Sequence, residues 1–103
     1  MRVPVRYEWD SAKREQNLSK HGLAFNDAWQ VYETPQKSDV PSIRSSVEWR
    51  RTATAFAPVA QAVSVLVYVA RDGSVRCISF RRASRREREA YSEYLEENRQ
   101  LHQ

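Results

Sequence analysis

The stretch RCISFRRASRREREAY, residues 76–91, joins a strand to a helix and decides how the C-terminal half of the chain folds. The strand is expected to end at about Arg82. Ser84 and Glu87 then form the S-x-x-E capping box, in which each side chain binds a backbone N–H of the first helical turn. We therefore expect a helix that is capped by Ser84 and runs from residue 85 to about residue 98. Its buried stripe should comprise Ala90, Tyr91, Tyr94, Leu95 and Asn98.

A hairpin precedes this stretch. Asp72-Gly73 is a strong two-residue turn signal, and residues 63–70 are apolar on both faces, as in a central strand. The turn predicts four cross-strand pairs: Val69 with Arg76, Tyr68 with Cys77, Val67 with Ile78, and Val65 with Phe80. Ile78 and Phe80 are expected in the core.

The N-terminal half predicts one edge strand and two helices. Residues 3–9 alternate with period two, and Pro4 places that strand at an edge. Residues 11–21 form a mostly solvated helix that begins after Asp10 and ends at Gly22, with Ala12 and Leu18 as its apolar contacts. One face of a second short helix should comprise Phe25, Ala28, Trp29 and Tyr32.

The remaining segments complete an α+β domain. Residues 36–46 read as a loop and residues 47–56 as a strand. The prediction is a single domain over residues 1–103, a small antiparallel sheet with helices packed on it, in the order β-α-α-β-β-β-α. The three tryptophans, Trp9, Trp29 and Trp49, are expected in the core, although each could instead stack on bases.

The charge of the chain favours a nucleic-acid partner. The 103 residues contain 17 Lys and Arg against 13 Asp and Glu, for a net charge of +4. Residues 76–88 alone hold six arginines and one glutamate, a local charge of +5. Arginine presents a planar fork that matches phosphate and stacks on bases. The alternative is a positive surface that only maintains solubility.

Other function classes are disfavoured by composition. The single cysteine cannot form an internal disulfide, and no apolar run suggests a signal peptide or a membrane span. We therefore expect a protein of the reducing cytoplasm that does not bind membranes. His21 and His102 are far apart and Gly22 and Gly73 are isolated, so neither a metal site nor a phosphate loop, and no cofactor, is expected.

The arginine cluster opposes local folding rules. Arg85 and Arg86 lie at the start of a helix, where the dipole is already positive, and Arg81 and Arg82 end the preceding strand. A bound phosphate would relieve this repulsion, because helix N-termini and arginine forks both bind anions. The alternative is an exposed cluster in which the arginines pair with the acidic side chains of the next turn, Glu87 and Glu89.

Two blocks of the chain resemble the BrnT family. Residues 76–91 match the signature R-x-I-S-x-R-x-A-[ST]-x-x-E-x-x-x-Y. The N-terminal block carries the family's other pattern on Tyr7-Glu8-Trp9-Asp10, Lys13, Asn17, Lys20-His21-Gly22, Phe25, Ala28 and Pro35. The resemblance implies a RelE-like fold and a toxin of a type II toxin–antitoxin pair that cleaves RNA. It also implies a BrnA-like antitoxin as partner, and operator DNA bound only through the complex of the two.

The resemblance and the arginine cluster together nominate the site. The catalytic candidates are Arg50, Arg51, Arg81, Arg85 and His21. The RNA-binding candidates are Lys20, Arg82 and Arg86. The middle of the chain departs from the family pattern at Glu48-Trp49-Arg50-Arg51, which leaves open whether Arg50 or Arg51 takes the family's arginine position.

Metal-independent cleavage would use the ribose 2′-OH as nucleophile, arginines to stabilise phosphate charge, and a group that moves protons. His21 has a suitable intrinsic pKa, with Lys20 or Glu48 as substitutes. A histidine in this position can equally interact with the end of its helix. Two alternative functions also stay open: a non-catalytic nucleic-acid-binding module, and a degenerate, inactive member of the family.

Overall fold

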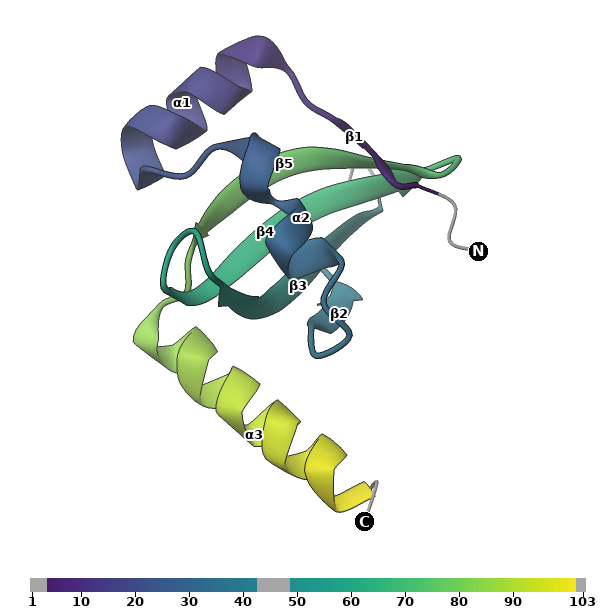
Figure 1. The fold of residues 1–103 in the computed structure, drawn as a ribbon, viewed down its shortest axis with the longest axis vertical. Coiled ribbons are helices and arrows are strands. Elements are labelled where there is room, and N and C mark those ends of the chain that lie inside the picture. The colour runs from purple at the N-terminus through teal and green to yellow at the C-terminus, as the bar shows by residue number, and fades with distance from the viewer. Residues whose placement is uncertain (1–3, 43–48, 102–103) are drawn as a thin grey trace.

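The computed structural model describes residues 4–42 and 49–101, which form one sheet with helices on one face (Figure 1). The elements in chain order are β1 (Arg6–Glu8), α1 (Ser11–His21), the 3₁₀ helix η1 (Phe25–Asp27), α2 (Trp29–Tyr32), β2 (Ser38–Pro41), β3 (Arg50–Ala57), β4 (Ala62–Arg71), β5 (Ser74–Arg82) and α3 (Arg85–Leu101). The five strands lie in the order β1-β5-β4-β3-β2. The α+β class is therefore confirmed.

The sheet is mixed, so the prediction of an antiparallel sheet was wrong in part. β1 pairs in parallel with β5, with Glu8 opposite Arg76. A further strand, β2, lies where a loop was expected, and it pairs antiparallel with β3. The polar sequence and Pro41 concealed β2, because an edge strand needs backbone pairing on only one side. The observed order is thus β-α-α-β-β-β-β-α.

The β4–β5 hairpin follows the predicted register only near its turn. Val69 pairs with Arg76 as expected, but a bulge then shifts the register, and Val67 pairs with Ser79 rather than with Ile78. Likewise Val65 pairs with Arg81 rather than with Phe80. The extra residue of a bulge interrupts strict alternation. This is what allows both Cys77 and Phe80 to be buried while Ile78 is only half-buried.

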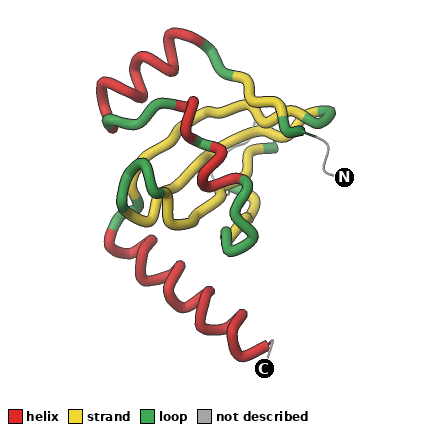
Figure 2. The backbone as a smooth tube through the Cα atoms, in the orientation of Figure 1, coloured by secondary structure: helices red, strands yellow, loops and turns green. Residues whose placement is uncertain are grey.

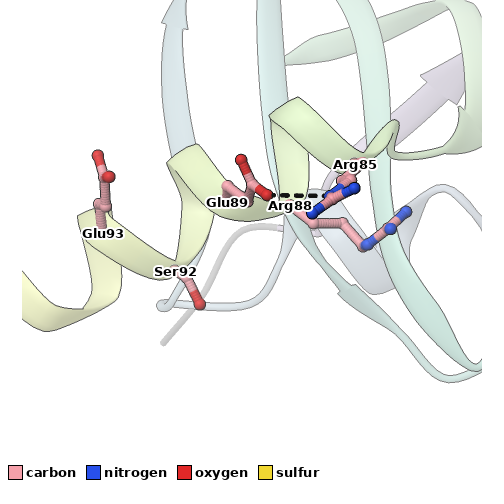
Figure 3. Close-up of a pocket in the computed structure, with 5 residues that line it drawn as sticks. All are labelled: Arg85, Arg88, Glu89, Ser92 and Glu93. Atoms are coloured by element: carbon pink, nitrogen blue, oxygen red, sulfur yellow. Dashed lines mark hydrogen bonds and ion pairs between the residues drawn. The ribbon is translucent and has the colours of Figure 1, made fainter.

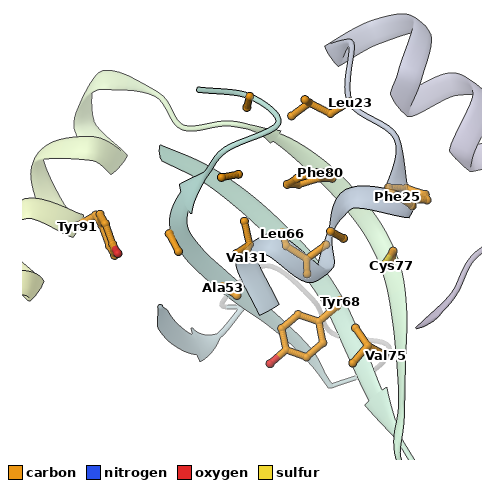
Figure 4. Close-up of a cluster of buried hydrophobic side chains, with 14 residues drawn as sticks. Leu23, Phe25, Val31, Ala53, Leu66, Tyr68, Val75, Cys77, Phe80 and Tyr91 are labelled. Atoms are coloured by element: carbon orange, nitrogen blue, oxygen red, sulfur yellow. The ribbon is translucent and has the colours of Figure 1, made fainter. Parts of the chain in front are cut away.

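The helices η1 and α2 cover one face of the sheet, named here the covered face (Figures 2 and 4). The buried side chains on this segment repeat every three residues, at Phe25, Ala28 and Val31. The backbone explains the spacing, because Val31 N–H donates to Ala28 O (3.0 Å) in the 3₁₀ pattern. Val31 therefore takes the core position that an α-helical spacing assigned to Trp29, which is 48% exposed.

The tryptophans differ in burial. Trp9 is half-buried and lies against Phe25, with ring centroids 6.2 Å apart, so its packing role is confirmed. Trp49 is 88% exposed, so the expectation of a core role was wrong for Trp49 as well as for Trp29. Trp49 directly precedes β3, where strand alternation no longer fixes the direction of a side chain.

Asn17 joins α1 to the sheet. Its Nδ2 donates to Phe80 O (2.7 Å) and to Leu23 O (2.9 Å), and its Oδ1 accepts from Phe80 N–H (3.0 Å). The amide thus pairs with the backbone N–H and C=O of Phe80, as a neighbouring strand would, at a point of β5 that β1 does not reach. Ala12 and Leu18, the expected apolar contacts, are exposed. The caps at Asp10 and Gly22 are confirmed.

The last helix begins as the capping box predicts. Ser84 N–H donates to Glu87 Oε1 (2.8 Å), and Glu87 N–H donates to Ser84 Oγ (3.2 Å). α3 then projects away from the sheet (Figure 1). Two tyrosine hydroxyls attach it to the segment before β2: Tyr91 donates to Gln36 O (3.0 Å) and Tyr94 to Lys37 O (2.9 Å).

The expected buried stripe of α3 is only partly correct. Tyr91 is buried, and Tyr94, Leu95 and Asn98 are half-buried, but Ala90 is exposed. The helix also continues to Leu101, beyond the predicted end.

Candidate active site

Residues from opposite ends of the chain meet where α1 ends and β5 ends. The Arg82 guanidinium donates from Nη1 to the carbonyl of His21 (3.5 Å) and from Nε to that of Ala60 (3.3 Å). Lys20 and Arg81 are both close enough to His21 to affect its titration. Four of the eight candidate residues, Lys20, His21, Arg81 and Arg82, are therefore brought together. The contacts between Asn17 and Phe80 fix this arrangement.

His21 is half-buried and favours the neutral form. Burial lowers the pKa of its imidazole below 6.5, and the positive charges of Lys20 and Arg81 lower it further. A neutral imidazole at pH 7 can accept a proton. The end of α1 is capped by the backbone N–H of Gly22, which donates to Leu18 O (2.8 Å). The imidazole is thus not required for that cap.

Arg81 is held by a bidentate ion pair with Glu87. Its Nη1 and Nη2 donate to the two carboxylate oxygens at 2.7 and 2.9 Å. This fork raises the pKa of Arg81 and, as the largest cause, lowers the pKa of Glu87 to about 2. Glu87 also completes the capping box, so one carboxylate both opens α3 and orients the guanidinium.

Arg85 and Arg86 lie on the exposed first turn of α3. Arg85 pairs with Glu89 at 3.2 Å, and with Arg88, Ser92 and Glu93 these residues line an open hollow of mixed charge (Figure 3). Arg81 and Arg85 therefore pair with different carboxylates, Glu87 and Glu89, as in the alternative reading of the cluster.

The neighbours Arg50 and Arg51 point to opposite faces of the sheet. Arg51 donates to Asp39 Oδ1 (2.9 Å) and to Asp39 O (3.0 Å) on the covered face, and this contact raises the pKa of Arg51. Asp39 also accepts a hydrogen bond from the hydroxyl of Tyr68. Arg51 therefore holds β2 against β3. Glu48 lies outside the described residues.

Arg50 belongs to the other face, named here the open face because no helix among the described residues lies across it (Figure 1). In the register of the sheet, Arg50 pairs with Val69 and Val69 pairs with Arg76, so the two arginines flank one valine. Arg76 Nη1 is 3.9 Å from Glu8 Oε2. Arg81 lies on the same face. It pairs with Val65, four positions from Val69 in β4, which is a distance of about 13 Å at the usual rise of a strand.

Arg76 is a basic residue that the sequence-based list of candidates omitted. The signal was present, because the turn at Asp72-Gly73 already paired Arg76 with Val69. What was missing was the register between β3 and β4, which places Arg50 beside that pair.

Two negative findings concern residues 4–42 and 49–101 only. No helix in these ranges is long and apolar enough to cross a membrane. No group of three or more His, Cys, Asp or Glu side chains in them is arranged to hold a metal ion.

Comparison with known families identifies the chain. A family model described as "Ribonuclease toxin, BrnT, of type II toxin-antitoxin system" matches residues 9–87. No curated protein matches the chain. The matched range includes most of both sequence blocks and the cluster at His21 and Arg81, and it ends within the first turn of α3. The chain therefore belongs to the BrnT family, the ribonuclease toxins of type II toxin–antitoxin systems.

Proposed function

We propose that this toxin cleaves RNA without a metal ion, at a site formed by His21, Lys20, Arg81 and Arg82. The observation that carries the proposal is the meeting of a neutral, half-buried imidazole with two arginines at the junction of α1 and β5. RNA carries its own nucleophile, the 2′-OH, so the protein has to supply a proton acceptor, a proton donor and positive charge.

The reaction would proceed by internal transesterification. His21 accepts the proton of the 2′-OH, and the 2′-oxygen attacks the adjacent phosphorus. The bond from phosphorus to the 5′-oxygen breaks, and Lys20 donates a proton to the departing oxygen. The products are a 2′,3′-cyclic phosphate and a 5′-hydroxyl. Arg81 and Arg82 stabilise the charge that develops on the phosphate oxygens.

Glu87 has a positioning role in this proposal. It holds the Arg81 guanidinium through two hydrogen bonds, so the fork does not have to reorganise when phosphate charge develops. Arg50 and Arg76 would bind the RNA backbone along the open face. Arg85 and Arg86 would contribute only peripheral electrostatic attraction. The contact of Arg51 with Asp39 supports a structural role for Arg51.

A second candidate function has one observation in its favour. If the Arg81–Glu87 pair keeps phosphate away from the guanidinium, the chain binds RNA without cutting it, or is an inactive member of the family. Exchanging Glu87 for glutamine separates the readings, because glutamine retains the capping box but lacks the charge. Slower cleavage in Glu87→Gln supports a positioning role, and faster cleavage supports obstruction.

The decisive experiment is cleavage of a defined RNA in the presence of EDTA. We expect wild-type protein to yield 2′,3′-cyclic phosphate ends, and Arg81→Ala to cut about 10²–10³-fold more slowly, as for the loss of one transition-state donor. The matched control is Arg99→Ala, which removes an exposed arginine at the far end of α3. Cleavage by Arg81→Ala at the wild-type rate would show that the phosphate site lies elsewhere.

The partner of the toxin follows from the same site. We propose that a BrnA-like antitoxin covers the junction of α1 and β5, and that operator DNA is bound through the complex alone. Expression of the toxin by itself should arrest bacterial growth, and co-expression with the adjacent gene's product should restore it. Normal growth while folded toxin accumulates would contradict this, as would an unchanged amide hydrogen exchange at Arg81–Arg86 in the complex. A RelE-like arrangement of the sheet also remains part of the proposal.

A further inference from the structure

A small cavity lies between α1 and β5, beside the proposed site. It has a volume of about 180 Å³ and is lined by Lys13, Gln16, Asn17, Lys20, His21 and Ile78. The first four residues follow one another on a single face of α1, since positions three, four and seven apart lie on the same side of a helix. Ile78 lines the cavity from the bulge in β5.

The lining of this cavity favours an anion. It contains two ammonium groups and no carboxylate. In the part of the chain that the structure describes, Lys13 and Lys20 form no ion pair with any Asp or Glu. The amide of Asn17 is already engaged by Phe80 and Leu23. The donors that face the cavity are therefore Lys13, Lys20, Gln16 and His21.

The size of the cavity restricts the ligand. Pockets for drug-sized molecules have volumes of about 300–1,000 Å³, and this open hollow of about 180 Å³ surrounds only part of a nucleotide. It suits a phosphate with part of its ribose. Lysine binds phosphate as a point charge and does not require the planar geometry of arginine.

We propose that this cavity is a second phosphate subsite, which binds the backbone phosphate next to the scissile one on the same RNA strand. The inference rests on the proposed function, because His21 lies on the rim of both sites. With one phosphate held by Lys13 and Gln16 and the next by Arg81, the ribose between them lies beside His21. Lys13 is then a binding residue that acts on the affinity for substrate.

The test compares Lys13→Gln with Arg99→Gln, which removes the same charge from a distant surface. The probe is a fluorescent RNA oligonucleotide with 2′-O-methyl groups, which cannot be cleaved. Its affinity is measured over a range of salt concentrations. Each phosphate contact on a single strand contributes about 0.7 to the slope of log K against log [salt]. We expect the slope to fall by about 0.7 in Lys13→Gln and to stay at the wild-type value in Arg99→Gln.

Cleavage kinetics give a second readout. Lys13→Gln should raise KM and leave kcat unchanged, because the subsite binds substrate and transition state alike. Since Lys13 is exposed, the variant should fold, and its thermal unfolding midpoint serves as the check. Equal salt slopes in Lys13→Gln and Arg99→Gln would overturn the subsite even if the wild-type protein cuts RNA.

The experiment also separates the two proposals and the two sources of phosphate. A loss of slope in Lys13→Gln without cleavage by the wild-type protein would retain the subsite and reject the nuclease mechanism. Inorganic phosphate is titrated alone as a further arm, followed by the amide shifts of Lys13 and Gln16. Tight binding of inorganic phosphate together with an unchanged RNA slope would identify a site for a free anion and overturn the assignment to the RNA backbone.

Discussion

Neighbouring residues in the strands lie in different surroundings on the two faces of the sheet. On the covered face, Leu66 is fully buried under η1 and α2, and even the charged Arg51 is engaged by Asp39. On the open face, one residue away in each strand, Arg50 and the half-buried Val67 lie under no described helix. The comparison teaches that strand alternation, more than residue type, decides which arginine joins the contacts under the helices and which lies on the other face of the sheet.

The largest expected effect contrasts buried and half-buried aliphatic side chains in the same strand. Leu66→Ala should lower the free energy of unfolding by about 2–5 kcal/mol, because it leaves a cavity in a packed core. Val67→Ala, on the open face, should cost less than half as much. Urea denaturation of the two variants measures both values. Equal losses would mean that the open face is packed as tightly as the covered one.

A smaller effect is expected from the adjacent arginines. Arg51→Ala should lower the free energy of unfolding by about 1 kcal/mol, because it removes two hydrogen bonds to Asp39, discounted for partial exposure. Arg50→Ala should weaken RNA binding with less effect on stability. Chemical denaturation and RNA titration of both variants test this division. The opposite pattern would transfer the functional role to Arg51.

The stability of the protein at acid pH tests the ion pair between Arg81 and Glu87. The pKa of Glu87 lies below its unfolded value, at about 2. The pair therefore stabilises the folded state above pH 4.5, and this contribution is lost as the pH falls from about 4.5 to about 2. Glu87→Gln should flatten that part of the curve of stability against pH. A variant curve that falls as steeply as that of the wild type would contradict the prediction.

The smallest stability effect concerns His21. Its folded pKa is lowered, so the unfolded chain binds the proton more tightly, and stability should decline as the pH falls below 6.5. The same shift places the acidic limb of the cleavage rate below pH 6.5, since His21 must be neutral to accept a proton. His21→Gln should remove both effects. A rate limb at or above pH 6.5 would exclude His21 as the base.

Local features of the fold were predictable from the sequence. The caps at Asp10 and Gly22 and the box of Ser84 and Glu87 were identified because each depends on side chains a few residues apart. The parallel pairing of β1 was not predicted, because it depends on where α1 returns the chain. The bulge at Ile78 was missed for a related reason: only the packing of Cys77 and Phe80 on one face requires an extra residue.

The candidate site was predictable as a set of residues but not as a geometry. His21 and Arg81 were nominated from proton chemistry, charge and the family resemblance, yet no short-range pattern indicates that they meet. The distinction between Arg50 and Arg51 needed the position of β2, whose Asp39 engages Arg51. The position of Arg76 beside Arg50 depends on two registers, that between β3 and β4 and that between β4 and β5. The sequence alone thus does not reveal polar contacts between residues that lie far apart in the chain.

The contact between Asn17 and Phe80 joins residues 63 positions apart, and this has a consequence for synthesis of the toxin. While a ribosome is still translating the strands before Phe80, the first helix has no edge of β5 to bind. His21 therefore cannot be set beside Arg81 on an incomplete chain. The site proposed above is therefore assembled only after the chain has been made through Phe80, so a nascent toxin shorter than this lacks it.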